Sequence, residues 1–204
     1  MKILTRAAAG SALLATTVSC ASCSSSGAAD STPARIPAHA GVISALPAAC
    51  SLVSAATLKA LDLQAKGMEQ PTAQRGGVLE KTCIWGASAQ AGGRSLTVVA
   101  DLFPAADGQT SVAAAENQFQ QNTSDQAQAD GDRGHAVSGL ANQAFVDQVT
   151  RSRLSQVQVV ARDQNVLATI AYSSLGTSGG PSVVARAGGA LTAARAVLSA
   201  LTAS

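Results

Sequence analysis

The chain is poor in the residue types from which most ligand and catalytic sites are built. Its 204 residues include three Phe, one Trp, one Tyr and two His, and charged residues make up only 13%. With so few aromatic side chains, the apolar core has to rest on Val, Leu and Ala, and alanine buries little area per residue. We therefore expect a thin core that is strengthened by a covalent crosslink.

Dense positive charge is also missing. The sequence has 14 Lys and Arg against 12 Asp and Glu. Lys2 and Arg6 lie in a leading segment that we expect to be removed, which would leave 12 of each sign. The remaining arginines are scattered and are not interleaved with aromatic residues. Because nucleic-acid binding depends on clustered positive charge, the sequence predicts no nucleic-acid partner.

No run is both long and apolar enough to cross a membrane. Residues 7–18 are apolar or small and follow the two positive charges of residues 1–6. This run is too short to cross the ~30 Å hydrocarbon layer as a helix. A short positive segment followed by a short apolar one is the layout of an export signal.

The cysteine that follows this segment predicts lipidation. Thr17, Val18 and Ser19 precede Cys20 and resemble a bacterial lipobox, in which the cysteine is acylated and the preceding peptide is removed. We expect residues 1–19 to be a lipoprotein signal peptide and Cys20 to carry palmitate-type acyl chains. The alternative is an ordinary secretory cleavage near Ala21.

A low-complexity segment follows the predicted anchor. Residues 20–46 are rich in Ser, Ala, Gly and Pro and show no hydrophobic period, which is typical of a tether. Residues 47–204 then form a single domain. Because an anchor of two or three acyl chains binds membranes stably, we expect this domain at the extracytoplasmic face of the cell membrane, with the membrane as a partner through the lipid anchor.

Export makes disulfide formation feasible for the remaining cysteines. Cys50 and Cys83 both lie in the predicted domain, and we pair them. Such a bridge stabilises a domain by roughly 3–4 kcal/mol on the chain-entropy model. A metal site is disfavoured because the domain has no Cys-x-x-Cys spacing. Cys23 is left over as a free thiol, a second lipidation site or an intermolecular partner.

Hydrophobic periodicity predicts an α+β fold. Helical spacing marks residues 54–62, 110–121 and 184–201, and residues 122–134 form a polar connection. Alternation marks strands over residues 80–85, 95–103, 144–149, 154–162 and 166–172, with the firmest turn at residues 163–165. We expect an antiparallel sheet of about five strands, with the helices packed mainly on one face and one disulfide as a staple.

Several short motifs resemble a known family. They are Pro47 before Cys50-Ser51-Leu52, then Cys83-Ile84-Trp85, the turn Gly139-Leu140-Ala141-Asn142-Gln143-Ala144, and a hairpin over residues 157–166. Together they are similar to the actinobacterial lipoproteins catalogued as domain of unknown function 3558. The family usually has Asp-Pro directly before the first cysteine and an acid where this chain has Asn142. The resemblance implies lipid anchoring, the Cys50–Cys83 bridge and an α+β domain, and no established activity.

Catalytic motifs are absent from the sequence. A serine hydrolase needs a nucleophile, a histidine and an orienting acid, but there is no Gly-x-Ser-x-Gly and the predicted domain has one histidine, His135. Glu80, Asp101 and Asp147 are available as acids, but nothing in the pattern pairs them. We therefore assign no catalytic residue, no cofactor and no metal ligand.

These observations leave two hypotheses of function. The favoured one is a non-enzymatic binding or accessory module at the cell surface, with a small molecule, a cell-wall component or a protein as its ligand. A groove beside Trp85 is the candidate ligand site, although packing of the indole on the disulfide is the more ordinary role for this residue. The alternative is an extracytoplasmic hydrolase with an atypical active site.

Overall fold

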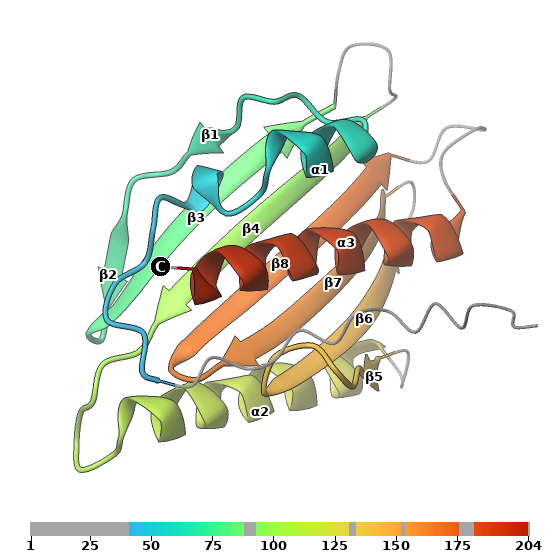
Figure 1. The fold of residues 1–204 in the computed structure, drawn as a ribbon. Coiled ribbons are helices and arrows are strands. Elements are labelled where there is room, and N and C mark those ends of the chain that lie inside the picture. The colour runs from blue at the N-terminus through green and yellow to red at the C-terminus, as the bar shows by residue number, and fades with distance from the viewer. Residues whose placement is uncertain (1–40, 88–92, 131–133, 152–153, 176–181, 204) are drawn as a thin grey trace, which may run out of the picture. The chain divides into compact units, whose positions relative to one another are not determined.

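The computed structural model describes residues 41–87, 93–130, 134–151, 154–175 and 182–203 (Figure 1). Its helices are the 3₁₀ turn η1 (Ala49–Ser51), α1 (Ala55–Ala60), α2 (Ser111–Asp130) and α3 (Val183–Thr202). Its strands are β1 (Met68–Glu69), β2 (Ala73–Arg75), β3 (Val78–Gly86), β4 (Arg94–Leu102), β5 (His135–Ala136), β6 (Gln143–Arg151), β7 (Leu154–Asp163) and β8 (Val166–Leu175). The predicted mixture of helices and strands is confirmed.

One antiparallel sheet contains all of these strands. Its order is β1-β3-β4-β8-β7-β6-β5, and β2 pairs with β3 beside β1. The five predicted strands correspond to the long strands β3, β4, β6, β7 and β8. The expected count of about five is nevertheless wrong, because the described residues form eight strands. The three additional strands have two or three residues each, too few for alternation to be recognised in a sequence.

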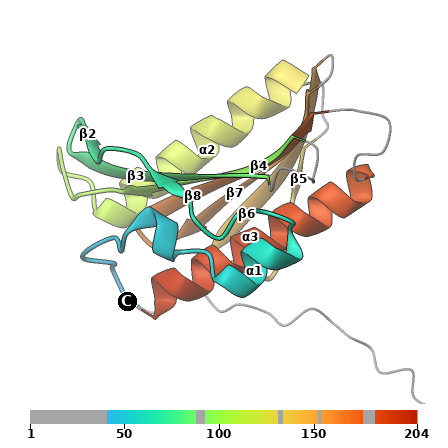
Figure 2. The same cartoon turned by 90° about the horizontal axis from the view of Figure 1, so that it is seen from above.

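Helices lie on both faces of the sheet. Helices α1 and α3 cover one face, as predicted, whereas α2 packs on the opposite face (Figure 2). Alternate residues of the long strands therefore enter two separate cores. The larger core lies beneath α1 and α3, and its most deeply buried large side chains are Leu52, Leu58, Trp85, Leu96, Val98, Val157, Val159, Ile170, Leu198 and Leu201.

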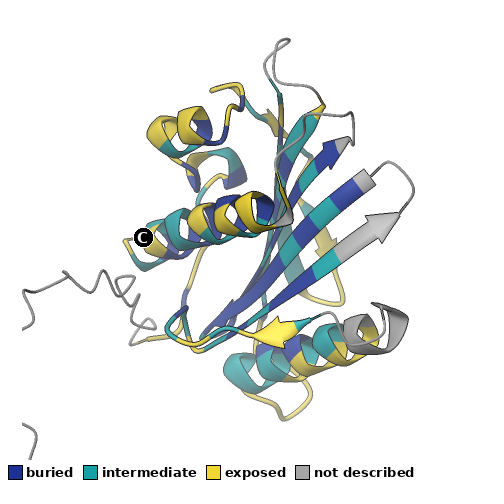
Figure 3. Ribbon diagram, turned by 90° about the vertical axis from the view of Figure 1, so that its right-hand side faces the viewer, coloured by how far each residue is buried: buried dark blue, intermediate teal, exposed yellow. Residues whose placement is uncertain are grey.

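The smaller core lies between α2 and the sheet. It consists of Phe103, Ala115, Phe119, Val160 and Leu167, with Val78, Ala114 and Phe145 packed against it. Helix α2 covers only part of its face of the sheet (Figure 3). Farther along the same face, Thr82 and Thr97 are only partly buried.

The segment before Pro47 belongs to the packed domain. Ile43 and Leu46 are both buried in the larger core, although the sequence assigns them to the tether. The backbone carbonyl of Leu46 accepts a hydrogen bond from Nζ of Lys81 at 2.6 Å. The domain thus begins at least four residues before the expected boundary.

Helix α2 is longer than predicted. It was expected to end near Gln121, but it continues to Asp130. Residues 122–130, which the sequence predicts as part of a polar connection, contain neither Gly nor Pro, and their Ala and Gln residues favour helix. At the start of this segment, the Asn122 side chain hydrogen-bonds at 2.8 Å to that of Gln118, one helical turn earlier.

Helical spacing predicts that α3 packs through Val184, Ala187, Leu191, Ala194, Leu198 and Leu201, and the observed face is slightly rotated from this one. Ala194, Leu198 and Leu201 are buried as expected, but Val184 is 81% exposed and Ala190, Ala193 and Val197 are buried instead. Gly189 explains the close approach, since a β-carbon there would lie 3.1 Å from Leu61 Cδ2 and 3.2 Å from Tyr172 Cε1. Among the described helices, none combines the length and the apolar character that a membrane crossing requires.

Candidate functional site

The predicted disulfide is present and organises one end of the larger core. Cys50 in η1 and Cys83 in β3 are bonded, with their Cα atoms 5.1 Å apart. The Glu69 carboxylate on β1 accepts hydrogen bonds from the backbone N–H groups of Ala49 (2.7 Å) and Cys50 (3.0 Å). The carboxylate thus satisfies the free N–H groups at the start of η1. This corner has a structural role.

Trp85 is part of the core and does not line a groove among the pockets described below. Its side chain is 1% exposed. Gly67 lies against both the indole and the Cys83 sulfur, because a β-carbon at Gly67 would be 2.6 Å from Trp85 Nε1 and 2.5 Å from Cys83 Sγ. The indole is therefore enclosed among the described residues, and it lines none of the four grooves described below.

The structure separates the candidate histidine from two of the three candidate acids, and the third, Asp147, is buried on β6. His135 is exposed on β5, where it lies opposite Val146 at one edge of the sheet. Glu80 and Asp101 lie opposite each other on β3 and β4, toward the other edge. A histidine that activates a hydroxyl must be within hydrogen-bonding distance of it and of an orienting acid. His135 does not share a cleft with these two acids.

The two facing carboxylates have an electrostatic consequence of their own. Burial, reinforced by the negative charge of Glu80, raises the pKa of Asp101 to about 6. Asp101 is thus a carboxyl group that takes up a proton in mildly acidic solution. Two carboxylates on one sheet face, without further ligands nearby, are not a metal site.

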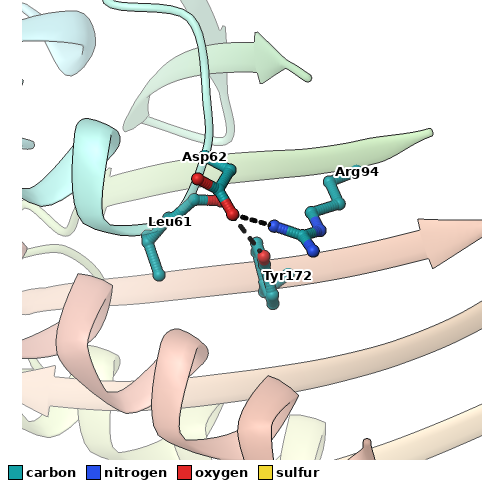
Figure 4. Close-up of polar contacts among 4 residues, drawn as sticks. All are labelled: Leu61, Asp62, Arg94 and Tyr172. Carbon is teal, nitrogen blue, oxygen red and sulfur yellow. Dashed lines mark hydrogen bonds and ion pairs between the residues drawn. The ribbon is translucent and has the colours of Figure 1, made fainter. Parts of the chain in front are cut away.

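A polar cluster joins α1 to the sheet (Figure 4). The guanidinium of Arg94 forms an ion pair with Asp62, and the Tyr172 hydroxyl donates to the Leu61 carbonyl oxygen at 3.3 Å. Burial raises the pKa of the Tyr172 hydroxyl, and the positive charge of Arg94 partly opposes this. Tyr172 is therefore a hydrogen-bond donor at neutral pH.

A shallow groove of about 280 Å³ borders this cluster. The Asp62 side chain is 63% exposed, and an ion pair with so exposed a partner contributes at most about 1 kcal/mol. We assign the cluster to the attachment of α1.

The largest of the described grooves lies between α2 and the β5–β6 edge, and we call it the α2–β6 groove. Its volume is about 620 Å³, within the range of small-molecule sites. Its lining residues are Phe119, Thr123, Ser124, Ala136, Val137, Ser138, Asn142, Gln143, Ala144 and Phe145. None of these residues carries a charge. The groove therefore suits an uncharged or largely apolar ligand.

Two phenyl rings form the apolar part of this groove. Phe119 comes from α2 and Phe145 from β6, and both contact the smaller core. Gly134, just before β5, leaves space for the Phe145 ring, since a β-carbon there would overlap it. The ring position thus depends on a residue without a side chain.

Two side-chain amides form the polar part. The backbone N–H of Gln164 donates to Oδ1 of Asn142 at 2.6 Å, and Nε of Arg162 donates to Oε1 of Gln143 at 2.7 Å. Both donors are N–H groups that cannot accept, so the amide oxygens face them and the NH₂ groups point elsewhere. Neither NH₂ group has an acceptor among the described residues.

Two smaller grooves, of about 380 and 390 Å³, border residues 42–44. The first described residues form part of both walls, and residues of β3, of the segment after β4 and of α3 also contribute. The part of the chain before Gly41 lies outside the described residues, as do Cys20 and Cys23. These grooves therefore carry no functional assignment.

Sequence reasoning missed the α2–β6 groove. In the sequence, Phe119 lies within the predicted helix over residues 110–121 and Asn142 and Gln143 lie in the turn motif, and no local pattern links the two segments. Comparison with protein families, curated proteins and solved structures finds no match. The resemblance to the lipoprotein family of unknown function remains a prediction.

Proposed function

We propose that the protein is a cell-surface lipoprotein, exported and acylated at Cys20, whose domain binds an uncharged or largely apolar ligand in the α2–β6 groove without transforming it. The observation that carries the binding role is the groove itself. It has a volume of about 620 Å³, has two phenyl rings on its wall and has no charged lining residue.

Its location is supported by the sequence and by the oxidised cysteine pair. The positive segment, the short apolar segment and the residues before Cys20 have the pattern of a lipoprotein signal. A structural disulfide such as Cys50–Cys83 forms and persists in oxidising compartments, which agrees with export.

The hydrolase alternative has less support. His135 is exposed at an edge of the sheet, away from the facing acids Glu80 and Asp101. The uncharged α2–β6 groove also offers no general acid or base at a bound ligand. Binding without chemistry is thus the function that the described geometry favours.

Mass spectrometry of the intact protein from its native membrane tests the location. We expect acyl chains on Cys20, no residues before it, and a Cys50–Cys83 bridge. An intact Met1 or reduced thiols at both positions would contradict the proposal.

A filled groove tests the binding role. Ala136 is exposed and lines the groove, so Ala136→Trp should block it while leaving the core intact. Ala56→Trp on exposed α1 is the control. Native mass spectrometry should find a co-purified small molecule on the wild type and the control but not on the blocked variant. Equal occupancy in all three would contradict a ligand site in this groove.

A further inference from the structure

We infer that the ligand of the α2–β6 groove is the acyl chain of a membrane lipid, with its carboxyl or ester carbonyl bound by the side-chain amides of Asn142 and Gln143. This inference rests on the proposed function and specifies its ligand. It follows from the orientation of two amides, the apolar wall beside them and the position of the predicted anchor.

The amides present donors toward a ligand. Gln164 N–H and Arg162 Nε–H each donate to one amide oxygen and orient it toward the protein, while the two NH₂ groups have no acceptor among the described residues. Such donors bind an acceptor group, such as a carbonyl, an ester or a carboxylate. The guanidinium of Arg162 also polarises the Gln143 amide, which strengthens its NH₂ as a donor.

The apolar wall begins two residues away on the same strand. Gln143 and Phe145 project from the same face of β6, since alternate strand residues share a face. Phe119 faces this strand from α2, with Ala136 and Val137 completing the wall. The groove thus has a polar end that can bind an acceptor group and an apolar part beside it. An acyl chain with its carboxyl or ester group has the same arrangement of polar and apolar parts.

The source of the chain follows from the predicted anchor. Gly41, the first described residue, stands 21 positions after Cys20. A fully extended segment of this length spans at most about 75 Å. An acylated chain would therefore keep the domain within this distance of the bilayer.

The groove lies near the entry of this segment into the domain. Asn165 binds Ile43 through its side chain, and its neighbour Gln164 donates to Asn142 in the groove. Gln164 and Asn165 are consecutive, so they connect the amide end of the groove to the point where the tether enters the domain. Membrane lipid is the apolar ligand present at highest concentration at such a site.

Fluorescent fatty-acid titration tests the inference. The mature chain with Cys20→Ser, which lacks its own acyl groups, is titrated with anthroyloxy-stearate and then with phosphatidylglycerol vesicles as competitor. We expect saturable binding that the vesicles reverse. Ala136→Trp should abolish it, and Ser124→Trp on the α2 side of the groove provides a second blocking variant.

A matched pair of charge variants tests the amide contact. Gln143→Glu keeps an acceptor for Arg162 but replaces the NH₂ donor by a carboxylate oxygen, so fatty-acid affinity should fall about tenfold or more. Gln148→Glu, on the same strand, makes the same charge change outside the groove lining and should change affinity less than about twofold. Equal effects of both variants would overturn the inference.

The remaining outcomes separate the inference from the proposed function. If the wild type binds no fatty acid, but another co-purified ligand is lost in Ala136→Trp, the inference fails and the groove remains a binding site. If no ligand depends on the groove, both fail. If only the acylated chain, without added lipid, has an occupied groove, the occupant is the protein's own anchor and the inference is overturned.

Discussion

Asn165 binds Ile43 through both atoms of its side-chain amide. Its Oδ1 accepts from the Ile43 N–H at 2.8 Å, and its Nδ2 donates to the Ile43 carbonyl at 3.0 Å and to the Phe103 carbonyl at 3.2 Å. The Asn165 side chain thus makes the pair of hydrogen bonds to the Ile43 backbone that a neighbouring strand residue would make. Asn165 itself lies in the turn between β7 and β8. It joins the first packed residues of the domain to the end of β4.

Replacement of this amide should destabilise the domain strongly. Asn165 is 3% exposed, so Asn165→Ala would leave one N–H and two carbonyl groups without their partner. We expect a loss of about 2–4 kcal/mol in the free energy of unfolding, measured by urea denaturation. Asn117→Ala on the exposed side of α2 is the control and should change it by less than about 0.5 kcal/mol.

The two adjacent glycines of α3 should respond to alanine differently. Gly188 is exposed with open space around its α-carbon, so Gly188→Ala should stabilise the helix by roughly 0.5–1 kcal/mol. Gly189→Ala would press on Leu61 and Tyr172, which should cancel or reverse this gain. Thermal unfolding of the two variants provides the comparison, and an equal gain in both would contradict the packing described at Gly189.

Loss of the disulfide should lower stability without changing the fold. Because Cys50 and Cys83 are 33 positions apart, the double variant Cys50→Ser, Cys83→Ser should lose about 3–4 kcal/mol. Glu69→Gln tests the neighbouring carboxylate and should cost about 1 kcal/mol, because one of its two acceptor oxygens is replaced by a donor. Denaturation under oxidising and reducing conditions measures both, and the reduced wild type should match the double variant.

Stability should fall as pH rises through the range in which Asp101 loses its proton. Burial beside Glu80 raises the pKa of Asp101 from 3.8 to about 6, so the folded protein holds this proton to a higher pH than the unfolded chain does. The resulting stabilisation is complete below about pH 4 and is lost as pH rises through 6. Asp101→Asn should reduce the difference in stability between pH 4 and pH 7 by about 1–2 kcal/mol. Asp125→Asn on exposed α2 should leave that difference unchanged.

Local sequence signals predicted the long elements well. Ser54, at the start of the helix predicted over residues 54–62, caps α1, with its Oγ accepting from Thr57 N–H at 3.1 Å. The turn at residues 163–165 joins β7 to β8. These features depend on neighbours in the sequence, so capping residues and alternation are sufficient to identify them.

Features that depend on tertiary contacts could not be predicted. Whether α2 covers the same face as α3 depends on the pairing of Phe103 and Leu167 with Phe119, which no local pattern specifies. The groove requires Phe119 and Phe145 to meet across two elements, and its amide donors are oriented by Arg162 and Gln164 from a separate hairpin. Trp85 is a candidate ligand residue because it is the one tryptophan of the sequence. Its burial depends on close packing against Gly67, which is a tertiary contact.

The side-chain NH₂ resonances of Asn142 and Gln143 report most directly on the claim that the α2–β6 groove is the ligand site. They can be followed by ¹H–¹⁵N NMR of the mature, unacylated chain during titration with a fatty acid. We predict saturable shifts of these two NH₂ groups together with the backbone amides of Phe145 and Ala136, and none in the groove beside residues 42–47. Shifts confined to that other groove, or no shifts at all, would contradict the account.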